Sequence, residues 1–293
     1  MNQIKYLITI LFFHGLIAQG NFQILNIPSS TRLLSLSNSG HAYNSLINSH
    51  NPASVKINNK NFNLQSHFYP ADIVYIKSEL VLPLANKVYS FEYSNLNYGE
   101  FLDAWSNYSF NSSEFLFKGS MKMEVLNKFS IGGGLSYGIN KISNQFAHAL
   151  FLSLGARTQM INPYLGLGLA VNNIGIINKN FSNSKDDLPT SILVSTFYQP
   201  TYFPGVLFCD VYKQNMIDDI EVRLGLESTI HKYLILRFGY NSNTNQLIDS
   251  HSNYLKGISA GVGIVSKKWD IDIGFYNLET AGLISSISLI YKK

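Results

Sequence analysis

The sequence predicts an all-β protein, a closed antiparallel transmembrane β-barrel of about fourteen strands. Three observations favour this fold class: a low content of charge, an export signal with no later apolar run long enough for a spanning helix, and many segments in which apolar and polar residues alternate. Only helices and closed barrels satisfy every backbone polar group in lipid. An exported membrane chain without spanning helices therefore has to be a barrel.

The composition fits a surface that does not mainly face water. Charged residues make up 14% of the chain, against about 25% in soluble globular proteins. The net charge is only +4, and Lys and Arg form no basic run, so we expect no nucleic-acid partner. Cys209 is the single cysteine, which excludes an intramolecular disulfide and a cysteine-based metal site.

Residues 1–20 are expected to be a signal peptide. Lys5 supplies the positive charge, Tyr6 to Ile17 the apolar stretch, and Ala18-Gln19-Gly20 a small-x-small cleavage site. The apolar stretch is shorter than the roughly 20 residues that a transmembrane helix needs. The mature chain is therefore expected to be exported and to begin at Asn21.

Residues 21–59 differ from the rest of the mature chain. They are rich in Ser and Asn, contain Pro28 and Pro52, and lack long alternating runs. This pattern predicts a compact irregular segment with one or two helical turns. We expect it to be distinct from the barrel, which residues 60–293 would form.

The barrel region divides into segments of about 10 to 15 residues with period-two patterning, separated by turn residues. In the clearest, apolar residues from Trp269 to Phe275 alternate with Asp270, Asp272 and Gly274. A soluble β-sandwich or propeller would also alternate, but the low charge, the absence of a blade-length repeat and the short turns favour a barrel. Strands are expected near residues 60–70, 73–82, 87–96, 113–125, 128–141, 145–159, 163–173, 188–199, 204–214, 219–230, 232–242, 254–266, 268–278 and 282–292.

In three alternating segments, residues 221–227, 234–241 and 269–275, charged residues are confined to one face of the expected strand. In a barrel with an apolar outer face, that face lines the lumen. Close approach on neighbouring strands would then give an internal ion-pair network. Two roles stay open: charges that satisfy one another and fix an internal segment, or a lining that selects solutes. The residues are Glu221, Arg223, Glu227, Arg237, Asp270 and Asp272.

Glycine also alternates with apolar residues in two expected strands, at Gly132 and Gly134 and at Gly166 and Gly168. Glycine weakens a strand interior unless another backbone approaches closely or the sheet bends. The pattern therefore fits a curved barrel wall or an internal segment packed against it.

No residue pattern points to an enzyme or a cofactor. Gly134-Leu135-Ser136-Tyr137-Gly138 matches G-x-S-x-G, but a hydrolase nucleophile elbow requires a turn from strand to helix, and this match lies within an alternating strand. The seven His residues show no metal-ligand spacing. We expect a non-enzymatic protein without metal or cofactor.

Several motifs resemble the PorV/PorQ family of outer-membrane proteins, relatives of the FadL fatty-acid channel. Asn26-Ile27-Pro28-Ser29-Ser30-Thr31-Arg32 and His50-Asn51-Pro52-Ala53 are similar to the N-terminal region of that family. Further similar motifs follow in the family's order over nearly the whole mature chain. They are Leu33–Leu36, Leu167–Gly175, Leu188–Thr190, Leu224–Glu227, Leu236–Asn241, Gly257–Gly263 and Ile287–Leu289.

The resemblance implies a fourteen-stranded barrel whose N-terminal segment folds back as a plug. Arg32 and Asn51-Pro52-Ala53 would be plug anchors, because a guanidinium can bond several acceptors on a polar wall and Asn before Pro sets a rigid turn. Contact with a ligand is the alternative role for these residues.

The resemblance also implies an accessory of protein secretion to the cell surface, of the type IX kind, with secretion components or exported cargo as partners besides outer-membrane lipid. The alternative is a FadL-like channel for hydrophobic small molecules. A lateral apolar slot and a pocket under the plug would favour the channel, and a lumen lined only by paired charges would count against it. An outer-membrane lipid hydrolase that uses Ser136 is the third hypothesis.

Overall fold

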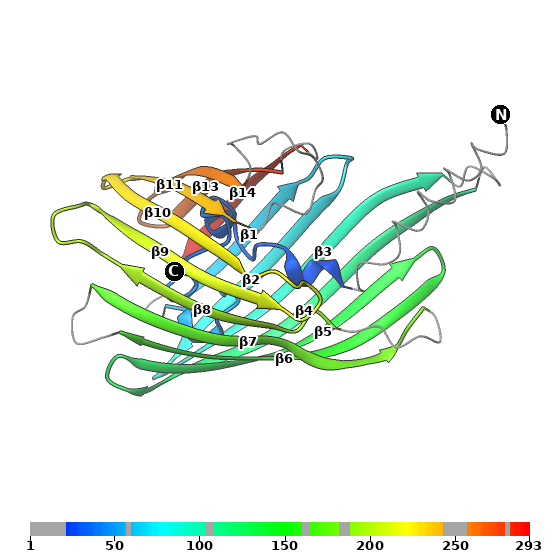
Figure 1. Cartoon of the computed structure of the whole chain (residues 1–293), viewed down its shortest axis with the longest axis horizontal. Coiled ribbons are helices and arrows are strands. Elements are labelled where there is room, and N and C mark those ends of the chain that lie inside the picture. Colours follow the sequence, from blue (N-terminus) through cyan, green and yellow to red (C-terminus); the bar gives the residue numbers. More distant parts are fainter. Residues whose placement is uncertain are drawn as a thin grey trace.

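The computed structural model describes residues 22–56, 60–102, 108–159, 164–181, 188–242, 257–278 and 282–293. In this part of the chain, fourteen strands form one closed barrel in which every neighbouring pair is antiparallel and β14 closes on β1 (Figure 1). The predicted fold class is confirmed. The predicted signal peptide lies outside the described residues.

Most strands begin and end within a few residues of their predicted bounds. They are β1 (Asn61–Phe68), β2 (Val74–Leu84), β3 (Lys87–Leu102), β4 (Ser109–Leu126), β5 (Phe129–Ile142), β6 (Gln145–Gln159), β7 (Leu165–Lys179), β8 (Ser191–Tyr198), β9 (Gly205–Gln214), β10 (Glu221–His231), β11 (Leu234–Asn241), β12 (Ile258–Val265), β13 (Trp269–Asn277) and β14 (Leu283–Lys292).

Two strands run further than predicted, because β-bulges interrupt the period-two pattern that marked their ends. The register of β3 against β4 shifts between Asn97 and Glu100, and β3 continues to Leu102. In β7, Asn172 and Asn173 lie between the residues paired with Leu154 and Leu152, and the strand continues to Lys179. A bulge adds an unpaired residue and moves every later side chain to the other face. A strand end predicted from alternation alone is therefore placed too early.

The alternation places apolar side chains outside and polar side chains inside the barrel. On β13, Trp269, Ile271 and Ile273 are exposed, whereas Asp270 and Asp272 are buried. On the other strands the exposed side chains are likewise mostly apolar, chiefly Leu, Ile and Phe, whereas the buried face is mixed and also contains apolar residues such as Phe151 and Leu193. No helix in the described ranges is long and apolar enough to cross a membrane.

Residues 22–56, here called the inner segment, lie within the barrel (Figure 1). Their described structure has three short helical pieces, η1 (Gln23–Asn26), α2 (Thr31–Leu34) and η2 (Pro52–Ser54). Ser30 caps α2 by accepting the backbone N–H of Leu33 at 3.1 Å. Strands from both sides of the barrel contact the segment: α2 packs on β13 and β14, and η2 on β4, β5 and β6.

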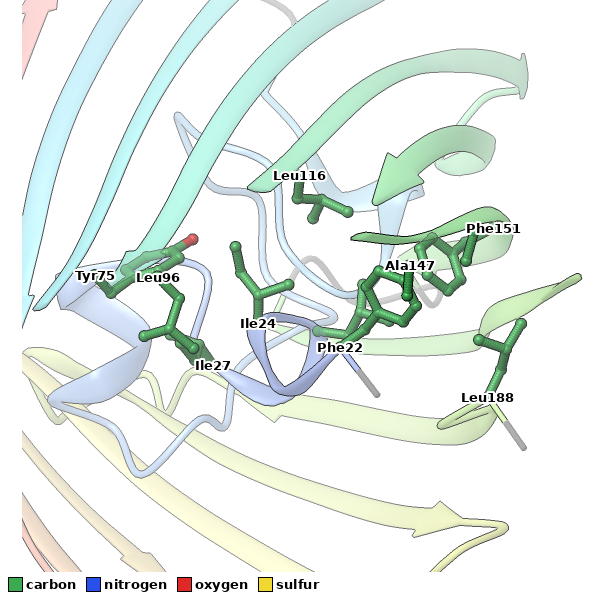
Figure 2. Close-up of a cluster of buried hydrophobic side chains, with 11 residues drawn as sticks. Phe22, Ile24, Ile27, Tyr75, Leu96, Leu116, Ala147, Phe151 and Leu188 are labelled. Carbon is green, nitrogen blue, oxygen red and sulfur yellow. The ribbon is translucent and has the colours of Figure 1, made fainter. Parts of the chain in front are cut away.

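The start of the inner segment forms an apolar cluster with the wall. Phe22 is fully buried and meets the ring of Phe151 edge-on at 5.3 Å between centroids (Figure 2). Ile24 and Ile27 point toward Leu116 and Tyr75 in the same cluster. Burial of apolar surface contributes about 25 cal/mol per Å², so this cluster fixes the segment at one side of the lumen.

Candidate functional site

The Asn51–Ala53 turn lies on a floor of glycines from three neighbouring strands. A Cβ at Gly132 of β5 would lie 2.5 Å from the carbonyl carbon of Pro52 and 2.6 Å from the nitrogen of Ala53. Cβ atoms at Gly155 and Gly168 would collide with the Asn51 side chain. These glycines therefore allow the turn to approach the wall at backbone distance.

A second glycine floor lies on the opposite side, on β10 to β13, and receives residues 35–39. A Cβ at Gly239 would overlap the backbone of Leu36 and Ser37. Cβ atoms at Gly261 and Gly274 would overlap the hydroxyl of Ser35. The inner segment thus fits between two sets of glycines that face each other across the lumen.

Arg32 links the inner segment to charges of the wall. Its Nε lies 2.7 Å from Oε2 of Glu227 on β10, and its Nη2 donates to Oε1 at 3.3 Å. Glu227 also accepts from Nε of Arg237 at 2.7 Å, and Nη1 of Arg237 lies 2.6 Å from Asp272. The guanidinium of Arg32 also lies 5.3 Å from the ring centre of Phe208. A charge chain therefore runs from α2 across three strands.

All six charged residues expected to line the lumen are buried, and in the described part of the chain they form three groups. Glu227, Arg237 and Asp272 join Arg32, as above. Glu221 pairs with Arg223 at 2.6 Å. Asp270 pairs with Lys292 at 2.6 Å. The sequence did not identify Arg32 and Lys292 as the partners of these groups.

A further charge cluster on β2 and β3 was missed. Lys77 lies 3.1 Å from Glu79 and 2.9 Å from Glu92, and all three side chains are almost fully buried. Lys77 also donates to the backbone oxygen of Ser29 at 3.0 Å, and Glu79 accepts the backbone N–H of Asn48 at 2.7 Å. Lys77 and Glu79 lie on one face of β2, but Ser78 between them interrupts the apolar face, so the alternation is weaker here than on β10 and β13.

Other wall side chains also bind the backbone of the inner segment. Glu114 accepts the N–H groups of residues 23 and 24 at 3.2 and 2.8 Å, and Asp210 accepts those of residues 40 and 41 at 3.0 and 3.1 Å. Lys122 donates to the oxygen of residue 55 at 2.7 Å, and Arg157 to that of residue 42 at 2.6 Å. These bonds satisfy backbone groups that would otherwise be buried without partners.

Two histidines of the inner segment stack on each other. The rings of His41 and His50 lie 5.0 Å apart at an interplanar angle of 24°. Burial, reinforced by the nearby positive charge of Arg223, lowers the pKa of His50 to about 3. Burial followed by the neighbouring His50 lowers the pKa of His41 well below its ordinary value. Both rings are therefore neutral at physiological pH.

A cavity of about 260 Å³ lies between the inner segment and the wall of β9 to β14. Its lining contains both apolar or aromatic and polar side chains, and includes the Glu221–Arg223 pair. The described lining residues do not include Arg32 or Asn51-Pro52-Ala53. They are Asn26, Pro28, Leu34, Ser37, Asn38, His50, Tyr69, Tyr212, Gln214, Ile217, Glu221, Arg223, Asn241, Tyr276, Leu278 and Ile284.

A second hollow, of about 630 Å³, is lined by β8 to β12. Exposed apolar side chains such as Leu207, Leu224 and Phe238 surround it, and Gly225 and Gly239 are part of its lining. The two glycines pair directly in the sheet and also contact the inner segment. The wall is therefore only one backbone thick between this hollow and the inner segment.

Ser136 does not form a nucleophile elbow. It lies in the middle of β5, with strand on both sides, and its side chain is buried. An elbow requires the serine at a sharp strand-to-helix turn, so the motif is a strand pattern. Among the residues that the structure describes, no three His, Cys, Asp or Glu side chains gather as a metal site.

The fold is similar to that of known hydrocarbon channels. The monoaromatic hydrocarbon channel CymD matches with a TM-score of 0.66 at 12% identity, over 90% of this chain and 97% of that one. The toluene transporter TodX of P. putida matches with a TM-score of 0.64 at 11% identity, over 91% and 99% of the two chains.

A Pseudomonas aeruginosa FadL homologue matches with a TM-score of 0.56 at 11% identity, over 90% of this chain and 98% of that one. No protein-family model matches the sequence. No curated protein matches it either. The likeness extends over nearly the whole length of the chains and shows a shared fold, the closed antiparallel barrel.

Proposed function

We propose that this protein is an outer-membrane channel for small hydrophobic solutes, in which the inner segment is the plug. The observation that carries the proposal is the cavity of about 260 Å³ between the inner segment and the wall. A largely preformed concave site with apolar walls and few polar groups is the usual form of a small-molecule site. The likeness in fold to channels for monoaromatic hydrocarbons and toluene supports the same function.

The outer wall supports a place in a membrane. Outward-facing side chains along the strands are apolar, whereas buried charges face the lumen, as in transmembrane barrels. The export signal expected at residues 1–20 would direct the chain out of the cytoplasm. Outer-membrane lipid is then the main partner of the barrel.

Some of the predicted site residues line the cavity and others do not, and the two groups have different roles. Arg32 and Asn51-Pro52-Ala53 contact the wall and lie outside the cavity lining, which supports the role of plug anchors. Glu227, Arg237 and Asp272 join Arg32 in that role. Glu221 and Arg223 line the cavity and are the charged pair that a solute would meet.

The test is uptake of radiolabelled toluene by a Gram-negative host that has no hydrocarbon channel of its own. Cells that produce the protein should take up toluene faster than cells with an empty vector. Ile217→Trp, which fills the cavity, should remove most of the gain, whereas Leu289→Trp on the outer face of β14 should keep it. Equal uptake with and without the protein, or recovery of the protein in the soluble periplasmic fraction, would overturn the proposal.

A role as secretion accessory is the second candidate, and the ordered PorV/PorQ-like motifs are the observation that favours it. The motif residues Arg32 and Asn51-Pro52-Ala53 form contacts within the barrel, so a partner protein is not needed to explain them. In the native host, deletion of the gene would distinguish the two functions. Loss of surface-displayed proteins with unchanged toluene uptake would favour secretion over the channel.

A further inference from the structure

The two ends of the barrel differ in the length of their connections. Because neighbouring strands are antiparallel, connections at one end alternate along the chain with connections at the other. One end has the short turns 85–86, 127–128 and 232–233, and the other has the longer connections 180–190 and 242–257. Transmembrane barrels have short turns on the periplasmic side and longer loops outside. By this rule the short-turn end would face the periplasm.

Exposed lysines gather at the short-turn end, whereas exposed carboxylates gather at the long-connection end. Among the described residues, Lys179 is the exposed lysine of the long-connection end, and Glu124 is the exposed carboxylate of the short-turn end. The exposed carboxylates of the long-connection end are Asp72, Glu100, Asp218 and Asp219. The exposed lysines of the short-turn end, here called the lysine rim, are Lys56, Lys60, Lys128, Lys232, Lys267, Lys268 and Lys293.

Part of the lysine rim is continuous across neighbouring strands. The backbone N–H of Lys293, directly after β14, donates to the oxygen of Lys60, directly before β1, at 2.9 Å. The backbone N–H of Lys292 donates to the oxygen of Lys268, directly before β13, at 2.8 Å. The exposed carboxylate of Glu124 lies on β4, three strands beyond β1. Like charges at close range repel one another, so this part of the rim favours a partner that brings negative charge.

Aromatic side chains lie directly beside the lysine rim. Trp269 follows Lys268 in the chain, is 46% exposed, and has its ring centre 4.6 Å from that of Tyr291. Tyr233 is 52% exposed, and Nζ of Lys232 lies 4.8 Å from the centre of its ring. Trp and Tyr are enriched at the headgroup level of membranes. The aromatic rings therefore place the lysine rim at the level of lipid phosphates.

We propose, resting on the place in an outer membrane proposed above, that the lysine rim binds the phosphate groups of anionic phospholipids in the periplasmic leaflet. A Lys ammonium binds phosphate as a point charge, and lysines near an anionic membrane surface each add to the attraction. An acidic protein would also be attracted by lysines, but the adjacent aromatic rings favour a lipid. Asp218 and Asp219 at the other end repel the same headgroups, so the charge division also favours one orientation of the barrel.

The experiment uses the full chain in phosphatidylcholine vesicles and compares the association of spin-labelled phosphatidylglycerol and spin-labelled phosphatidylcholine by electron paramagnetic resonance. One lysine near the surface favours an anionic lipid by a factor of about five in its leaflet, so phosphatidylglycerol should be preferred about threefold when both leaflets are averaged. The preference should disappear in about 1 M sodium chloride, where charges are screened beyond roughly 3 Å.

Two double variants place the preference at one end of the barrel. Lys267→Gln/Lys268→Gln should lower the preference for phosphatidylglycerol to about twofold or less, because the remaining lysines of the rim retain part of it. Lys141→Gln/Lys179→Gln removes the same charge from the long-connection end and is the matched control, which should behave as wild type.

The outcomes separate this proposal from the channel function. Equal association of the two labelled lipids with the wild-type chain, or an equal loss of preference in both double variants, would overturn the lipid site and leave the channel standing. Failure of the wild-type chain to enter vesicles would overturn its place in a membrane and with it the proposed function. Because the comparison of lipids and its dependence on salt use the wild-type chain, they remain decisive if a variant does not fold.

Discussion

Two charged clusters of the inner wall bind the inner segment in different ways. On β2 and β3, Lys77 and Glu79 bond backbone atoms, the oxygen of Ser29 and the N–H of Asn48. On β10 to β13, Glu227 instead accepts a hydrogen bond from a side chain, the guanidinium of Arg32. Binding of the inner segment on the β2–β3 side therefore depends on the path of its backbone. Binding on the β10–β13 side depends on the side chain of Arg32.

The difference has an energetic consequence. A backbone group is present whatever residue occupies the position, so side-chain substitutions in the inner segment should be tolerated where the wall bonds its backbone. A buried ion pair loses free energy when one partner is removed, because the other charge stays buried without compensation. Within the inner segment, substitution of Arg32, whose side chain the wall binds, should therefore cost more than substitution of Ser29, whose backbone the wall binds.

The largest effect is expected for Glu227→Gln. The change leaves Arg32 without a carboxylate and Arg237 with Asp272 alone. We expect the free energy of unfolding to fall by about 3–5 kcal/mol, the usual cost of breaking a buried ion pair. Urea unfolding of the barrel in lipid vesicles measures this.

Glu100→Gln is the matched control for that variant, because Glu100 is exposed on β3. It should change stability by less than about 0.5 kcal/mol, as surface substitutions usually do. A Glu227→Gln barrel as stable as the Glu100→Gln barrel would show that the charge chain from Arg32 to Asp272 does not stabilise the fold.

The two glycine floors should respond alike, because both contact the inner segment at backbone distance. Gly132→Ala would place a Cβ 2.5 Å from the carbonyl carbon of Pro52, and Gly239→Ala would place one against Leu36. We expect each to lower the free energy of unfolding by about 1–3 kcal/mol, as overpacking does, and to make the inner segment more sensitive to protease.

Gly119→Ala on β4 is the control, because a Cβ there has no described atom within 4 Å. Unfolding in urea and limited proteolysis of folded protein together give the measurement. If Gly132→Ala and Gly239→Ala matched Gly119→Ala in both assays, the close seating of the inner segment would be wrong.

Acid should weaken the inner segment through its stacked histidines. Burial lowers the pKa of His50 to about 3 and that of His41 below its ordinary value, whereas an unfolded histidine has a pKa of about 6.5. Below about pH 6.5 the unfolded chain binds protons that the folded chain does not, so the free energy of unfolding decreases as the pH is lowered. For His50 the decrease continues down to about pH 3 and is on the order of 1 kcal/mol per pH unit.

The measurement is the free energy of unfolding between pH 7.5 and pH 5 for wild type, His41→Gln and His50→Gln. Each variant should show a shallower fall than wild type over this window. Identical slopes in all three proteins would mean that these rings do not titrate differently in the folded and unfolded chains.

The fold could be predicted from the sequence because period-two alternation reports directly which face of a strand meets water or lipid. The pattern ended two expected strands too early, near Asn97 and near Asn172-Asn173, where bulges shift the alternation. It also marked the inward charges of β10 to β13, because Glu221 and Asp272 lie between apolar neighbours.

The pairing of those charges could not be predicted, because it depends on strand register and on the path of the inner segment. Arg32 and Glu227 are far apart in the chain and meet only when α2 packs against the wall. The cavity depends on the same folding back, since its lining joins Leu34 and Asn38 to residues near the ends of the last strands. No local pattern in the sequence encodes such contacts.

The smallest effect is expected for Ser29→Ala, on the side where the wall bonds the backbone. The oxygen that accepts from Lys77 at 3.0 Å and from Gln65 at 2.9 Å belongs to the backbone and remains. The lost hydroxyl made one bond, to the oxygen of Asn48 at 3.2 Å, so we expect a change of less than about 1 kcal/mol. Urea unfolding of Ser29→Ala and Glu227→Gln gives the comparison. An equal loss of unfolding free energy in the two variants would contradict the distinction between backbone and side-chain binding, because Ser29→Ala leaves the wall contacts of its backbone in place.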